Sequence, residues 1–140
     1  RRGSKIFDQL IVGVADSRNK KPFFTLEERI EMASEVLSHY PNVKVLGFSG
    51  LLKDFVRENQ GNVILRGLRA VSDFEYEFQM ALANRKLNPE LDTVFLMTSA
   101  EYMYLSSSIV KDIAVHGGGV ADFVPEGIMQ DIVRRIRKGE

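Results

Sequence analysis

The chain has 140 residues, of which 44% are hydrophobic and 27% are charged, a length and composition typical of one soluble globular domain. Its 19 basic and 19 acidic residues cancel, so no overall field attracts it to nucleic acid or to a membrane. It has no cysteine, which excludes disulfides, thiolate nucleophiles and cysteine-based metal sites.

Membrane insertion, secretion and histidine-based metal binding are not expected either. No apolar run approaches the roughly 20 residues that span a bilayer. The opening residues 1–4, RRGS, do not begin a signal peptide. The two histidines, His39 and His116, lie far apart in the sequence and do not have metal-ligand spacing. We therefore expect a cytoplasmic protein.

Segments typical of strands and helices alternate along the chain. Residues 1–5 are too short to form an element of their own and are candidates for the end of one. Short apolar runs predict strands over residues 9–15, 42–47, 63–65 and 93–97. Helical spacing of apolar residues predicts helices after Thr25, over residues 51–59 and 72–85, after residue 108 and near Pro125. This order predicts an α/β fold, a Rossmann-like parallel sheet with helices on both faces, in one domain over residues 1–140.

Local signals mark several helix ends. Thr25 with Glu28 and Ser72 with Glu75 both have the spacing of a capping box, in which side chains satisfy the first free N–H groups. Pro125 suits the first turn of the last helix. The basic residues 134–138 suit its end, where they complement the helix dipole.

Two arginines stand where a strand is predicted to end and a helix to begin. The apolar run of residues 63–65 is followed by Arg66, Gly67, Leu68 and Arg69, which we expect to form a loop. In open α/β sheets ligands bind at the carboxyl ends of the strands. Because arginine binds phosphate through its planar fork of donors, this loop predicts an anionic ligand. The alternative is that both arginines are solvated and paired with Asp73 or Glu75.

Two more loops with phosphate-binding chemistry are predicted at strand ends. Lys20 and Lys21 follow the first strand, and Ser106, Ser107 and Ser108 enter a helix after the last. A serine-capped helix start offers N–H groups and hydroxyls to an anion. The alternatives are a solvated lysine pair and a plain serine N-cap.

Convergence of these loops on one edge of a parallel sheet favours phosphoryl or nucleotidyl transfer. Such reactions depend on positioning and charge stabilisation more than on a protein nucleophile. Neither of the usual glycine-rich phosphate loops, G-x-x-x-x-G-K-[ST] and G-x-G-x-x-G, occurs in the sequence.

Three segments resemble the phosphopantetheine adenylyltransferase family, a group within the nucleotidyltransferase superfamily, in their order and spacing. They are residues 17–29 (SRNKKPFFTLEER), 66–77 (RGLRAVSDFEYE) and 105–111 (LSSSIVK). With residues 84–85 and 89–97, the resemblance covers essentially the whole chain. It implies a reversible reaction of coenzyme A synthesis, in which ATP and 4′-phosphopantetheine give dephospho-coenzyme A and pyrophosphate. The substrate phosphate is then itself the nucleophile.

The resemblance also implies roles for individual residues. Lys20 and Arg66 would bind the phosphate of 4′-phosphopantetheine, Leu52 would line the pantetheine pocket, and Lys20, Arg66 and Arg69 would be catalytic. Contacts with ATP are implied for Gly67, Leu68, Arg69, Glu77, Tyr102, Met103, Tyr104, Leu105, Ser106, Ser107 and Ser108. Mg²⁺ is expected to accompany ATP, although the sequence shows no dedicated set of metal ligands. Coenzyme A is an expected ligand as well.

Apolar residues occupy more than one face of the predicted helix over residues 72–85. Phe74 and Phe78 lie on one face, and Tyr76, Met80 and Ala83 on another. A helix that is apolar on two faces usually buries both. The family is typically hexameric, so we expect a homo-oligomer, a hexamer, with the second face at or near a subunit contact.

One family motif, T/H-x-G-H, does not occur in the sequence, and neither His39 nor His116 follows a glycine. The resemblance begins partway along the family's first helix, after its first strand. We therefore expect either a piece of a longer protein or a relative without the catalytic histidine, and favour the former because the other motifs are intact. Two further functions stay open. One is a nucleotidyltransferase with another phosphorylated acceptor, and the other is a non-catalytic protein that binds coenzyme A or a nucleotide.

Overall fold

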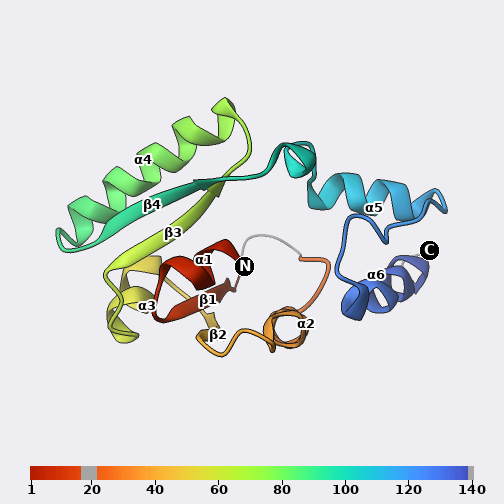
Figure 1. Ribbon diagram of the computed structural model, residues 1–140, viewed down its shortest axis with the longest axis horizontal. Coiled ribbons are helices and arrows are strands. Elements are labelled where there is room, and N and C mark those ends of the chain that lie inside the picture. Colours follow the sequence, from red (N-terminus) through yellow and green to blue (C-terminus); the bar gives the residue numbers. More distant parts are fainter. Residues whose placement is uncertain (17–21, 139–140) are drawn as a thin grey trace. The chain divides into compact units, whose positions relative to one another are not determined.

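The structure, a computed structural model, describes residues 1–16 and 22–138 (Figure 1). The chain divides into two compact units, the first made of residues 1–47 and 105–140 and the second of residues 48–104. Strands and helices alternate in both, and the strands of the second unit are parallel, which confirms the predicted α/β class. The prediction of a single domain over residues 1–140 stays a prediction. No helix in the described ranges is long and apolar enough to cross a membrane.

The described residues of the first unit form one strand pair and four helices. These are α1 (Arg2–Ile6), β1 (Leu10–Ala15), α2 (Leu26–Leu37), β2 (Val43–Phe48), α5 (Ser107–Val115) and α6 (Glu126–Lys138). β1 pairs with β2, and α6 contacts both α2 and α5. Val110, Val120 and Ile136 form the buried core on the α5 and α6 side. Residues 1–5, which we expected to be too short for an element of their own and candidates for the end of one, lead into and form most of the short helix α1.

Side-chain hydrogen bonds define the ends of several elements in this unit. The Thr25 hydroxyl accepts from the Glu28 backbone N–H at 3.2 Å, and the Glu28 carboxylate accepts from the Thr25 N–H at 2.8 Å. This confirms the predicted capping box at the start of α2. Asn42 joins α1 to β2, because its side-chain amide donates to the carbonyls of Ser4 and Phe7 at 2.7 and 2.9 Å.

The second unit is built around a parallel strand pair. It contains α3 (Leu52–Glu58), β3 (Val63–Leu68), α4 (Val71–Leu87), β4 (Asp92–Met97) and the 3₁₀ helix η1 (Ala100–Tyr102). β3 and β4 run parallel in a register that places Arg66 beside Phe95. Figure 1 shows α4 connecting the two strands, both of which it contacts. The buried apolar residues of this unit are Ile64 and Leu91.

Two predictions about the region around Arg66 were wrong. We expected the strand to end at Leu65, but β3 continues to Leu68, because Arg66, Gly67 and Leu68 pair with successive residues of β4. Arg66 and Gly67 therefore belong to the strand rather than to a loop. Ser72 is not the N-cap that we expected for the next helix either. α4 begins earlier, at Val71, with Ala70 as N-cap and no side-chain hydrogen bond at the cap.

The described strands form two pairs, β1 with β2 and β3 with β4. One continuous sheet of all four strands therefore stays a prediction. The parallel pairing of β3 and β4 brings the carboxyl ends of both strands to the same edge. At that edge the Thr98 N–H, just after β4, donates a hydrogen bond to the carbonyl of Leu68, the last residue of β3, at 2.9 Å.

Candidate functional site

An ion pair between Arg66 and Glu77 lies at the centre of the second unit's candidate site. Arg66 is in β3 and Glu77 in the middle of α4. The Arg66 Nε donates to Glu77 Oε2 at 2.7 Å, and Nη2 donates to Oε1 at 2.5 Å. The carboxylate side chain is only 13% exposed, whereas that of Arg66 is 47% exposed. Glu77 is thus the less exposed half of a bidentate pair, and the cation of that pair reaches solvent.

The charge of Arg66 is stabilised by this arrangement. The hydrogen bonds to Glu77 raise the pKa of Arg66 above its ordinary value, while partial burial opposes the change. The guanidinium therefore stays positively charged at any pH at which the protein is folded. A permanently charged, oriented and half-exposed arginine is suited to binding a phosphate group.

The second arginine, Arg69, has a looser partner close by in sequence. Its Nε donates to Asp73 Oδ2 at 3.2 Å, and its backbone N–H donates to the same oxygen at 3.3 Å. The side-chain bond is the main cause of a lowered pKa of Asp73. The expected alternative, a solvated arginine paired with Asp73, is thus observed for Arg69. Arg66 pairs instead with Glu77, which that alternative did not include.

Other residues predicted to contact ATP or substrate lie in the same unit. Gly67 is exposed, Leu68 is half-buried, and Leu52 is the half-buried first residue of α3. Tyr102, Met103 and Tyr104 follow β4 and are 47%, 49% and 56% exposed. Since the carboxyl ends of β3 and β4 share one edge, Arg69 and the segment after β4 belong to the same end of the strand pair.

The serine run lies in the first unit, at the start of α5. Ser106 is the N-cap, and its hydroxyl accepts from the Ile109 N–H at 3.3 Å, so the alternative of a plain serine cap is observed for this residue. Ser107 and Ser108 open the helix and are exposed, while Leu105 before them is half-buried. Their hydroxyls and the first N–H groups of α5 have the chemistry of an anion site.

The remaining predicted site residue, Lys20, lies outside the described residues, as does Lys21. We predicted that the three phosphate-binding loops meet at one edge of the sheet. These loops include Lys20 and belong to both units of the chain. Their convergence stays a prediction, as do the individual residue roles.

A cavity of about 470 Å³ in the second unit does not coincide with this site. It is lined by Asn62, which precedes β3, and by Pro89 and Glu90, which precede β4. It therefore lies at the amino ends of the strands. Because ligands of parallel α/β sheets bind at the opposite ends, we do not assign the candidate site to it.

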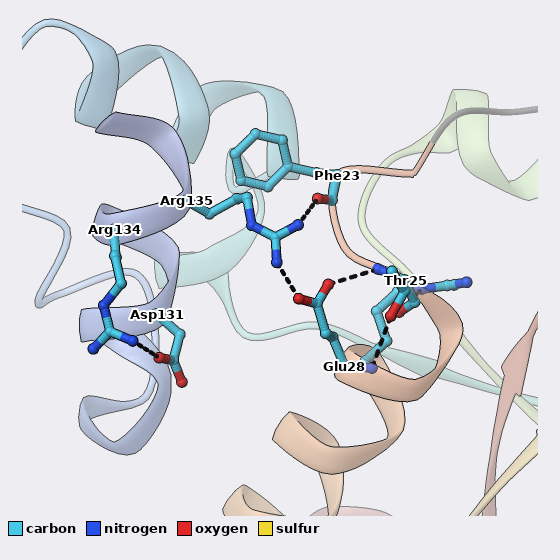
Figure 2. A network of polar contacts seen from close by, with 7 residues as sticks. Phe23, Thr25, Glu28, Asp131, Arg134 and Arg135 are labelled. Atoms are coloured by element: carbon cyan, nitrogen blue, oxygen red, sulfur yellow. Dashed lines mark hydrogen bonds and ion pairs between the residues drawn. The ribbon is translucent and has the colours of Figure 1, made fainter. Parts of the chain in front are cut away.

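The sequence did not predict a second polar network, in the first unit, which Figure 2 shows. Arg135 of α6 donates from Nη1 to the Phe23 carbonyl at 3.2 Å and pairs through Nη2 with Glu28. Its guanidinium also lies over the Phe24 ring at 5.0 Å. We had assigned Arg135 only to the helix dipole, and no local pattern marks a partner 107 residues away.

Comparison with known proteins gives one family model and several similar enzymes. The cytidylyltransferase-like family model matches residues 1–113. A phosphopantetheine adenylyltransferase of Paraburkholderia xenovorans is 60% identical over 136 residues, which cover 97% of this chain and 80% of the relative. The enzyme of that name from Cupriavidus taiwanensis is 60% identical over 140 residues, 100% of this chain and 87% of the relative. That from Burkholderia mallei is 65% identical over 124 residues, 89% and 75% of the two chains.

The matched regions cover between 89% and 100% of this chain. A chance likeness confined to one motif would not cover so much of each chain. The chain belongs to the phosphopantetheine adenylyltransferase family, within the cytidylyltransferase-like nucleotidyltransferases.

Proposed function

We propose that this protein transfers the adenylyl group of ATP to 4′-phosphopantetheine, which yields dephospho-coenzyme A and pyrophosphate. The observation that carries this proposal is the 60% identity to an enzyme named for that acceptor over the entire chain. The half-exposed guanidinium of Arg66, held near the carboxyl end of β3, supports it, because the acceptor presents a phosphate.

The proposed step needs no nucleophile from the protein. An oxygen of the acceptor phosphate attacks the α-phosphorus of ATP and forms a new P–O bond. The bond from that phosphorus to the bridging oxygen breaks, and its electron pair leaves with pyrophosphate. Catalysis then consists of holding two polyanions in line and compensating their charge.

The residues divide between the two substrates. Arg66, with Lys20, binds the acceptor phosphate, and Leu52 contacts the apolar part of pantetheine. Arg69, the backbone at Gly67 and Leu68, and residues 102–108 contact ATP. The exposure of Arg69 and of Tyr102 to Tyr104 supports this division, because these groups are accessible beside the carboxyl ends of β3 and β4.

Mg²⁺ belongs to the proposal only as the companion of ATP. In the part of the chain that the structure describes, no group of three or more Asp, Glu, His or Cys side chains could hold a metal ion. Mg²⁺ commonly binds through substrate phosphates with few protein ligands. It would thus arrive with the nucleotide, whose phosphate charge it compensates, and we assign no step to it.

The proposal also includes assembly into a homo-oligomer. We expect a hexamer, as the family resemblance implies. Five large apolar side chains of α4 are between 41% and 62% exposed: Phe74, Tyr76, Phe78, Met80 and Leu82. An apolar surface of this density is typical of a protein contact. Coenzyme A binding stays a prediction of the family resemblance. A cytoplasmic location stays a prediction from the sequence.

Turnover with defined acceptors tests the function. The purified protein is incubated with ATP, Mg²⁺ and 4′-phosphopantetheine, and pyrophosphate and dephospho-coenzyme A are both quantified. Arg66→Ala should lower kcat/KM for 4′-phosphopantetheine by about one to two decades, the effect of losing a charge-assisted pair. Arg57→Ala is the matched control, because Arg57 is 71% exposed on α3 and pairs only with a helix neighbour, Asp54.

The same assay separates the two other functions. Faster turnover with a different phosphomonoester would identify a nucleotidyltransferase with another acceptor. Binding of ATP and 4′-phosphopantetheine without release of pyrophosphate would identify a non-catalytic relative. Either result would refute the proposed reaction.

A further inference from the structure

Arg29, near the start of α2, contacts the backbone on both sides of the segment that carries Lys20. We infer that Arg29 is a positioning residue for Lys20 in binding the acceptor phosphate, an inference that rests on the proposed function. It holds the two ends of residues 16–24 at a fixed separation and acts on the phosphate only through Lys20. The roles that the family resemblance implies do not include Arg29.

The place of Arg29 in the helix explains these contacts. Side chains of an α-helix lean toward its amino end, so a residue four places after the N-cap covers the start of the helix. Thr25 is the N-cap of α2. The Arg29 Nε donates to the Thr25 carbonyl at 3.3 Å, and Nη1 donates to the Ala15 carbonyl at 3.0 Å. One planar guanidinium thus joins the last residue of β1 to the cap of α2.

Further contacts hold the α2 side of the segment independently of Arg29. The Arg135 Nη1 donates to the Phe23 carbonyl at 3.2 Å (Figure 2). The Lys111 Nζ lies 5.0 Å from the centre of the Phe23 ring. The Phe23 and Phe24 rings pack edge to face, with their centroids 5.1 Å apart. The residues just before α2 are therefore attached to α5 and α6, and Arg29 adds the link from α2 to β1.

The consequence for Lys20 follows from the two fixed ends. Lys20 itself lies outside the described residues, but Ala15 and Phe23, on either side of it, lie within them. Holding the ends of a chain segment together reduces the conformational freedom of the residues between them. A group with less freedom loses less entropy when it binds a ligand. Arg29 therefore favours binding of the acceptor phosphate without touching it.

Steady-state kinetics of Arg29→Ala test this inference. We expect kcat/KM for 4′-phosphopantetheine to fall about tenfold, as for a misplaced binding group, and the KM for ATP to stay within about twofold. Asn42→Ala is the matched control, because Asn42 also donates to two backbone carbonyls of the first unit, those of Ser4 and Phe7. It joins α1 to β2 instead and should leave both constants unchanged. An unchanged kcat/KM for the acceptor in Arg29→Ala, or equal losses in the two variants, would overturn the inference.

A double-mutant cycle with Lys20 separates positioning from other roles of Arg29. In a Lys20→Ala background, Arg29→Ala should lower kcat/KM for the acceptor by less than about twofold, because no lysine is left to position. A guanidinium that bound the phosphate directly, or that only stabilised the fold, would cause its full loss in either background. Additive effects of the two substitutions would therefore refute the positioning role.

Two further measurements keep the test decisive. If Arg29→Ala does not fold, Arg29→Lys serves instead, because lysine keeps the charge but has a single nitrogen for two carbonyls. Its kcat/KM for the acceptor should then fall about fivefold, and an unchanged value would refute the inference. Calorimetric binding of 4′-phosphopantetheine without ATP separates the two proposals. Binding that depends on Arg29 without any turnover would refute only the proposed reaction, and turnover with binding independent of Arg29 would refute only the positioning role. Absence of both binding and turnover would refute both proposals.

Discussion

Truncation of Arg135 to alanine should destabilise the protein more than the same change at Arg134, its neighbour in α6. Arg135 connects α6 with the segment that leads into α2, through the Phe23 carbonyl and the Glu28 carboxylate (Figure 2). Its guanidinium also lies over the Phe24 ring. These contacts join parts of the chain that are more than 100 residues apart in sequence. Arg135→Ala removes all of them at once.

The expected loss in the free energy of unfolding is about 2 kcal/mol. The hydrogen bond from Arg135 to the Phe23 carbonyl is charge-assisted but 3.2 Å long, so we take about 1 kcal/mol, below the usual range for such bonds. The cation over the Phe24 ring adds roughly 0.5–1 kcal/mol at a partly exposed site. The ion pair receives no separate value, because solvent screens pairs that are 36% exposed. At about 4 °C per kcal/mol, Tm should fall by about 8 °C.

Thermal unfolding of wild type, Arg135→Ala and Arg134→Ala is the assay. Arg134 is the control because it lies next in the same helix, is 66% exposed and, among the residues that the structure describes, has its ion pair with Asp131, at 3.5 Å. We expect its Tm to change by less than about 2 °C, as for other exposed ion pairs. Equal changes in Tm for the two variants would refute the reasoning.

The pH dependence of the Tm difference between wild type and Arg135→Ala gives an independent check. The pKa of Glu28 is lowered chiefly by the Thr25 backbone N–H and next by Arg135. A carboxylate whose folded pKa is lowered stabilises the protein fully above its ordinary value of 4.5 and loses that contribution as pH falls through the lowered value. The Tm difference between wild type and Arg135→Ala should therefore be constant above about pH 5 and should shrink below pH 4.5. A difference that grows on acidification would contradict this assignment.

Three further predictions concern packing and assembly. Leu91→Ala should lower the free energy of unfolding in urea by about 3–5 kcal/mol, because this side chain is 1% exposed; a loss below about 1 kcal/mol would contradict its burial. Gly47→Ala should cost about 1–3 kcal/mol in the same titration, because a Cβ there would lie 2.5 Å from Ile30 Cδ1, and adding Ile30→Val, which removes that atom, should recover part of the loss. Tyr76→Glu should lower the mass measured by sedimentation at micromolar concentration, because the ring is 62% exposed on α4 and a charge there opposes an apolar contact; a monomeric wild type would rule this out.

Features that depend on neighbouring residues were predicted well from the sequence. The capping box of Thr25 and Glu28 formed as expected because both partners lie within one helical turn. The four strands appeared where apolar runs were found, with ends shifted by up to three residues. The end of β3 was misjudged because its last residues are polar or glycine, and they become strand only through hydrogen bonds to β4, a segment about thirty residues away.

The candidate site shows the same division between local and distant partners. Residue type and position identified Arg66 and Arg69, and the pairing of Arg69 with Asp73, four residues on, could be foreseen. The partner of Arg66 could not, because Glu77 is eleven residues away and meets it only when α4 folds back over β3. The contacts of Arg135 were not predicted for the same reason, since its partner Glu28 is 107 residues away in the sequence. Charge pairs across the chain require the fold before they can be named.

The path of the chain from β3 into α4 explains why Arg66 and Glu77 meet. Side chains alternate along a strand, so Arg66 shares a face with buried Ile64, and its neighbour Phe95 on β4 contacts Phe74 of α4. Arg66 lies two residues before the end of β3, about 7 Å back along the strand. Glu77 lies six residues after the start of α4, about 9 Å along the helix, which runs back over the strand pair. The two side chains therefore reach similar depths below the edge where ligands are expected, and a strand–helix connection of two residues sets that match.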